Sequence, residues 1–171
     1  MINQIVIIIL KRVKRIAKIL LAVLLVAAGI FISMRERGIY TFWHNKVERV
    51  SSSIGQRVMN TETPMIIDAR TPEEFEVSHI ENAVLYTEKM LDNIDENQAL
   101  MIYCTVGVRS NSLANELSKK GFKHVYELKT GILGWKNESF PVVNQENELT
   151  EDVHVYNAFF SRFLKQGKAV Y

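Results

Sequence analysis

The 171-residue chain begins with a long apolar run and then changes to short apolar segments that alternate with polar ones. No polar side chain interrupts residues 19–32, and the run extends over 16–34 when Lys18 reaches the membrane surface and Ser33 lies near it. A spanning helix needs about 20 residues. The pattern therefore predicts a transmembrane helix at 16–34 that acts as an uncleaved anchor. A cleaved signal peptide and a buried core helix are the alternatives.

Basic residues predict the orientation of this helix. Five Lys or Arg side chains lie in or just before its start, whereas only Arg35 and Arg37 follow the run. The positive-inside rule keeps residues 1–15 in the cytoplasm and places the rest of the chain on the extracytoplasmic, periplasmic side. Residues 1–37 carry a net charge of +6 and residues 38–171 one of −4. The globular part is mildly acidic, so we expect no nucleic-acid partner.

After a stem at 35–60, short apolar segments alternate with helical patterns. Strands are predicted at 65–67, 83–86, 100–103, 124–128 and 141–143, and helices from Thr71 onward and at 88–91, 109–120 and 132–136. Strands separated by helices are typical of an α/β protein whose mostly parallel central sheet carries helices on both faces. In the tail, 146–171, apolar positions at helical spacing between 151 and 165 predict an amphipathic helix packed on the domain.

The only cysteine, Cys104, lies where the strand at 100–103 runs into a loop and then a helix. Such a loop turns backbone N–H groups inward, and the helix behind it adds the positive end of its dipole. Because Arg109 adds a full positive charge, these features favour the thiolate, which is the nucleophilic form of cysteine. The alternative is a small buried hydrophobic residue. One cysteine excludes an intrachain disulfide, and the scattered histidines predict no metal site.

Five sequence blocks, in order and spacing, resemble those of a single-domain rhodanese. They are 68–75, 79–83, 103–110, 131–135 and 140–142. The resemblance covers 61–145 and implies the rhodanese-like α/β fold and a sulfurtransferase that needs no cofactor. It implies that Cys104 takes the outer sulfur of a small anionic donor, thiosulfate or a persulfide, and hands it to a thiol or cyanide. The implied anion-binding loop consists of Thr105, Val106, Gly107, Val108, Arg109 and Ser110.

Four residues separate Cys104 from Arg109. By the same resemblance, the related phosphatases have five, which gives a wider cradle for phosphate or arsenate, so phosphatase or arsenate reductase activity is disfavoured. Rhodanese-like domains also include catalytically silent members, so a non-catalytic binding module at the membrane stays an alternative. Thr105 and Val106 are neutral where thiosulfate-preferring members often carry a basic residue, which points toward a persulfide donor. With no second cysteine, the acceptor comes from outside the chain, and a protein thiol is one option.

Three further polar residues carry predictions, and one of them, Asp68, lies at the sheet edge of Cys104. Asp68 follows a strand and either orients the active loop from behind or forms a helix cap or turn. We expect Arg70 to pair with Glu74 or another acid, with a substrate contact as the alternative. His79 matches the family's histidine, and we interpret it as a hydrogen-bonded structural residue.

Overall fold

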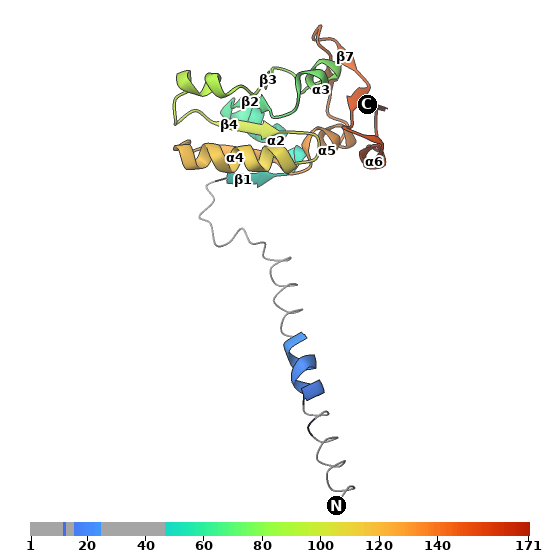
Figure 1. Cartoon of the computed structure of the whole chain (residues 1–171). Coiled ribbons are helices and arrows are strands. Elements are labelled where there is room, and N and C mark those ends of the chain that lie inside the picture. Colours follow the sequence, from blue (N-terminus) through green and yellow to red (C-terminus); the bar gives the residue numbers. More distant parts are fainter. Residues whose placement is uncertain (1–11, 13–15, 25–46) are drawn as a thin grey trace, which may run out of the picture. The chain divides into compact units, whose positions relative to one another are not determined.

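The computed structural model describes residues 12, 16–24 and 47–171, and Figure 1 shows the chain. Residues 16–24 are helical. Within the described residues, no helix has both the length and the apolar character needed to cross a membrane. The predicted span at 16–34 continues past residue 24, so its second half and the first part of the predicted stem lie outside the described residues.

A five-stranded parallel sheet organises residues 47–171, with the strand order β1-β5-β4-β2-β3. The strands are β1 (Val47–Val50), β2 (Met65–Asp68), β3 (Val84–Leu85), β4 (Leu100–Tyr103) and β5 (Val125–Leu128). All four neighbouring pairs are parallel. The α/β class predicted from the alternation of strands and helices is confirmed.

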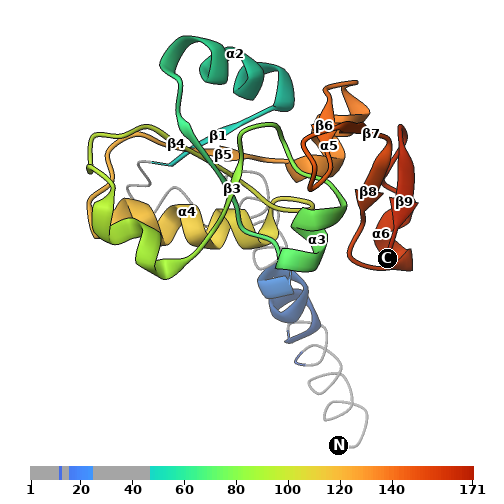
Figure 2. The ribbon, with the colours of Figure 1, turned by 90° about the horizontal axis from the view of Figure 1, so that it is seen from above.

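Helices cover both faces of the sheet. Helix α4 (Val108–Lys120) packs on β4 and β5, whereas α2 (Ser52–Glu62) and α5 (Gly131–Asn137) pack together on the opposite side, as Figure 2 shows for α4 and α2. All four residues of β4 are buried and alternate between the two resulting cores. The first core contains Met101 and Tyr103, and the second contains Leu100 and Ile102. This burial on both faces explains why β4 is a continuous apolar run.

Two short helical elements connect strands of the sheet, one between β2 and β3 and the other between β3 and β4. Helix α3 (Pro72–Val77) starts as predicted, because Thr71 and Glu74 form a capping box: the Thr71 side chain accepts from the Glu74 N–H, and the Glu74 carboxylate accepts from the Thr71 N–H. The helix predicted at 88–91 is a 3₁₀ helix, η2 (Glu88–Asn93). The capping box fixes the position of the Glu74 side chain, which is part of the candidate functional site.

The structure differs from the prediction at residues 47–60, which were assigned to a stem. They form the edge strand β1, paired with β5, and most of helix α2. Ser51 caps α2 by accepting a hydrogen bond from the Ile54 N–H. The Gly55 position packs against Leu128 of β5. Because β1 joins the sheet only through a strand that lies 75 or more residues later, the local pattern gave no sign of it.

The tail also differs from the prediction, because it does not form an amphipathic helix over 151–165. After β6 (Val142–Val143) come β7 (Leu149–Thr150), β8 (Asp152–His154), the short helix α6 (Ala158–Ser161) and β9 (Lys168–Val170). Val153 and Val155 are both fully buried, which is the spacing of a strand. Strands β6 and β7 form a two-stranded antiparallel sheet, and β8 pairs with β9 in a two-stranded parallel sheet. We call residues 146–171 the C-terminal segment.

Candidate functional site

Cys104 lies directly after the carboxyl end of β4, at the start of the loop that leads into α4. Its side chain is buried, with 1 % exposed. The Gly107 N–H donates a hydrogen bond to Sγ over 3.1 Å. Helix α4 begins at the next residue, so the positive end of a 13-residue helix faces the sulfur. The loop therefore offers a negatively charged sulfur both a donor and a favourable dipole.

Two glycines let the loop close around Cys104. Gly107 has a φ of 90°, and a Cβ there would collide with the Lys129 carbonyl oxygen. Gly131 begins α5, and a Cβ there would collide with the Cys104 carbonyl. Because the side chain is missing, α5 comes close enough for the Ile132 N–H to donate to the Cys104 carbonyl over 2.8 Å. The backbone of the loop is thus held from behind by a second helix.

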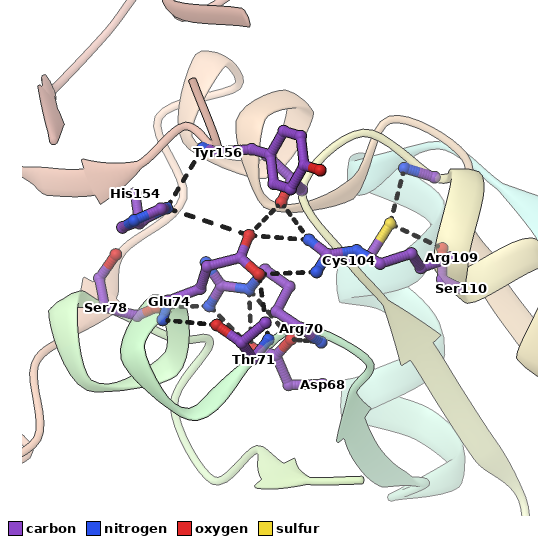
Figure 3. A network of polar contacts seen from close by, with 12 residues as sticks. Asp68, Arg70, Thr71, Glu74, Ser78, Cys104, Arg109, Ser110, His154 and Tyr156 are labelled. Atoms are coloured by element: carbon purple, nitrogen blue, oxygen red, sulfur yellow. Dashed lines mark hydrogen bonds and ion pairs between the residues drawn. The ribbon is translucent and has the colours of Figure 1, made fainter. Parts of the chain in front are cut away.

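Arg109 is bound by Glu74 of α3 through two hydrogen bonds, of 2.6 and 2.7 Å (Figure 3). Thr105 joins the same network, because its hydroxyl donates to Glu74 and accepts from Arg109, both over 2.8 Å. Burial raises the pKa of Glu74, but hydrogen bonds from Arg109, from the Thr71 N–H and from Thr105 outweigh it and lower the pKa to about 2. The hydrogen bonds to Glu74 raise the pKa of Arg109. At neutral pH this is a fixed ion pair.

Behind the loop, Ser110 connects Cys104 to a second buried acid. The Ser110 hydroxyl donates to Glu127 Oε1 over 2.8 Å and lies 3.5 Å from Cys104 Sγ. Glu127 is fully buried in β5, and its other oxygen accepts from Arg49 Nε of β1 over 2.7 Å. A hydroxyl has one proton, and the shorter contact to a charged carboxylate is the stronger one. Ser110 therefore binds Glu127 first.

A pocket of about 230 Å³ opens over Cys104. Val106 and Val108 of the loop and Tyr156 and Phe160 of the C-terminal segment supply its apolar walls. The guanidinium carbon of Arg109 lies 5.6 Å from the centre of the Tyr156 ring, and Figure 3 shows Tyr156 on the same side of the network as His154. The nucleophile is therefore at the floor of a pocket of mainly apolar character.

The comparisons with known proteins agree on one family. The model of the rhodanese-like domain matches residues 55–138. A protein named sulfurtransferase from Allochromatium vinosum is 30% identical over 100 residues, which are 56% of this chain and 94% of that protein. The uncharacterized protein YibN of Escherichia coli is 28% identical over 106 residues, which are 58% of this chain and 74% of YibN.

This chain belongs to the rhodanese-like domain family. A solved structure supports the fold: the rhodanese-like domain of an Anabaena protein superposes with a TM-score of 0.52 at 19% identity, over 56% of this chain and 78% of that domain. The matched residues begin inside α2, so β1 joins the central sheet from outside the matched range.

Asp68 and Arg70, expected behind the loop of this rhodanese-like domain, form a buried pair of their own. Arg70 Nη2 donates to Asp68 Oδ2 over 2.7 Å and to the Ser78 carbonyl over 2.5 Å. Burial lowers the pKa of Arg70, but the interactions with Asp68, Tyr103 and Glu74 together outweigh it and raise the pKa. Among the described residues, the side-chain hydrogen bonds of this pair do not reach the loop at 104–110. The pair joins the end of β2 to the end of α3.

His79 has the hydrogen bonds predicted for it. Its Nδ1 lies 3.0 Å from the Phe75 carbonyl oxygen, and its ring stacks on Phe75 with a centroid separation of 3.9 Å. Its backbone N–H donates to the Val143 carbonyl.

Four residues of the site were not predicted from the sequence: Glu74, Glu127, Tyr156 and Phe160. Glu74 was named only as a possible ion-pair partner of Arg70, whereas it binds Arg109. Glu127 carried a usable signal, because an acidic residue within a buried strand needs a partner. Tyr156 and Phe160 carried none, since they reach the pocket only after the C-terminal segment folds back beside α3.

Proposed function

We propose that this rhodanese-like protein is a sulfurtransferase that carries sulfur as a persulfide on Cys104. In the first half-reaction, the Cys104 thiolate attacks the outer sulfur of a sulfane donor. A new sulfur–sulfur bond forms while the donor's own bond to that sulfur breaks, and the electron pair leaves with the donor residue, which is sulfite when thiosulfate reacts. In the second half-reaction, an acceptor thiolate or cyanide takes the terminal sulfur and restores the Cys104 thiolate.

One observation carries this proposal: the Gly107 N–H donates to Cys104 Sγ at the floor of an open pocket, in front of the α4 N-terminus. Backbone donors in a fixed loop stabilise charge on sulfur without having to reorganise. A cysteine that served only as packing would not need such a donor or such access. Because the chain has no second cysteine, it cannot release the sulfur by forming an internal disulfide, and an external acceptor is required.

The proposal is tested by incubating the purified chain with a panel of sulfane donors that includes thiosulfate. A mass increase of about 32 Da on Cys104, one sulfur atom, is the expected covalent intermediate. The variant Cys104→Ser is the control and should show no increase. If no donor modifies Cys104 while the chain binds a partner, the rhodanese-like domain is a binding module.

The proposal includes attachment of the chain to a membrane through its N-terminal apolar run. The apolar run at 16–34 and the basic residues before it support a single-pass anchor with the rhodanese-like domain on the extracytoplasmic side. The full chain should then stay with the membrane during alkaline carbonate extraction. A reporter that is active only outside the cytoplasm, fused after residue 171, should be active. Release of the chain by carbonate, or an inactive reporter, would refute the anchor or its orientation.

A further inference from the structure

The pocket over Cys104 is closed on one side by the C-terminal segment, which holds Tyr156 and Phe160 in place. Val153 and Val155 of this segment are fully buried, and β8 pairs with β9. Asn137 of α5 holds the part of this segment that follows α6. Its side chain donates to the Phe163 carbonyl over 2.8 Å and accepts from the Lys165 N–H over 2.6 Å. The apolar wall is therefore built into the fold.

The charge in the pocket is almost cancelled. Among the described residues that line it, Arg109 is the only Lys, Arg, His, Asp or Glu. Both terminal nitrogens of Arg109 bind the Glu74 carboxylate, so its positive charge has a fixed counter-charge. A dianion such as thiosulfate would enter a largely apolar pocket with no unopposed cation in its lining, which is costly.

We propose that this pocket selects an organic sulfane-sulfur donor, a monoanion whose apolar, preferably aromatic, group packs against Tyr156 and Phe160, over the thiosulfate dianion. The inference rests on the proposed function. The size of the pocket is compatible with it, because its volume is about 230 Å³ and an apolar cavity of about 150 Å³ can hold a benzene molecule. The ion pair of Arg109 and Glu74 has no net charge, so a donor with one negative charge enters the pocket at a lower cost than a donor with two.

The transfer step needs no further reactant. The Cys104 thiolate attacks the terminal sulfur of an organic thiosulfonate anion, and a sulfur–sulfur bond forms. The bond between the terminal sulfur and the sulfonyl sulfur breaks, and its electron pair leaves on the sulfinate. A thiolate and a donor monoanion enter, while a persulfide anion and a sulfinate anion leave, so charge and electrons balance.

The test compares three donors on the full chain: thiosulfate, the methanethiosulfonate anion and the benzenethiosulfonate anion. The rate constant for persulfide formation on Cys104 is followed by mass spectrometry, and each rate is divided by that of free cysteine with the same donor, which removes intrinsic reactivity. We expect benzenethiosulfonate to exceed methanethiosulfonate by at least about tenfold, since burial of a ring adds binding energy. Thiosulfate should be the slowest.

Variants locate the effect. Phe160→Ala should remove most of the difference in corrected rate between benzenethiosulfonate and methanethiosulfonate. Phe159→Ala, on the exposed side of the same helix, should keep this difference. Because Phe160 also packs on the core, Val108→Lys serves as a second variant at a side chain that is 70% exposed. The added cation should speed thiosulfate several-fold more than benzenethiosulfonate.

The outcomes separate this inference from the proposed function. Equal corrected rates for the two thiosulfonates, or a clear preference for thiosulfate, would overturn the inference and leave the sulfurtransferase intact. No persulfide on Cys104 with these three donors or with the wider panel of sulfane donors would overturn the proposed function itself.

Discussion

At the scale of single residues, Ser110 has one hydroxyl proton and two neighbours that can accept it. Glu127 is the closer of the two and is fully buried, so it needs this donor as well as Arg49. A buried carboxylate that loses a hydrogen bond is destabilising because no water replaces the donor. The polar contacts of Ser110 thus support the fold of the rhodanese-like domain as well as the position of Cys104.

The variant Ser110→Ala should therefore lower the free energy of unfolding by about 2 kcal/mol. Ser112→Ala, on the exposed face of the same helix, is the matched control and should stay within about 0.5 kcal/mol of the parent chain. Urea denaturation of the three proteins gives the comparison. Equal stability of the two variants would show that the hydrogen bond between Ser110 and Glu127 contributes nothing.

The roles of Cys104 and Arg109 could be predicted at this scale because they depend on neighbouring residues alone. A cysteine, a glycine and an arginine follow one another closely where a strand leads into a helix. Asp68 and Arg70 were placed at the correct end of β2, but their bonds go to each other and to their own surroundings. The pairing of buried charges depends on side-chain directions in space, which spacing along the chain does not reveal.

At the scale of elements, Glu74 connects α3 to the loop in front of α4. Its pKa of about 2, against an ordinary value of 4.5, means that the folded state binds the proton more weakly than the unfolded state. The stabilisation is complete above pH 4.5 and is lost as the pH falls through 4.5 toward 2. After a discount for solvent at the partly exposed Arg109, it amounts to about 2 kcal/mol.

Glu74→Gln should therefore destabilise the chain at pH 7 by about that amount, and the difference from the parent chain should shrink as the pH falls from 5 to 2. Glu76→Gln, exposed on the same helix, controls for the general effect of removing an acid. Denaturant titrations at a series of pH values measure both. A gap between Glu74→Gln and the parent that stays constant over this range would contradict the ion pair.

The elements of the sheet from β2 to β5 and the helices between them follow from local apolar runs and caps, so the sequence predicted them well. The edge strand β1 and the C-terminal segment did not follow. Tyr156, Phe159, Phe160 and Phe163 have helical spacing, but Asn157 caps only a single turn, and Tyr156 has a positive φ of 69°. Pairing of β8 with β9 overrides the local pattern there.

At the scale of the whole rhodanese-like domain, three chain regions meet around one sulfur atom. The loop after β4 supplies Cys104, α3 supplies the counter-charge for Arg109, and the C-terminal segment supplies the apolar wall. The α/β class could be predicted because it depends on the order of elements. The residues of the apolar pocket wall could not be predicted, because they lie about 50 residues after Cys104 in the sequence and reach the pocket only in the folded chain.

The central claim is that sulfur passes through Cys104, and a single-turnover experiment tests it most directly. The chain is loaded with sulfur, freed of donor and mixed with an acceptor thiol, while mass spectrometry follows both the protein and the acceptor. We predict that the protein returns to its original mass as one acceptor persulfide forms for each loaded chain. A stable adduct that no thiol or cyanide removes, or sulfur transfer by the Cys104→Ser variant at the same rate, would contradict the account.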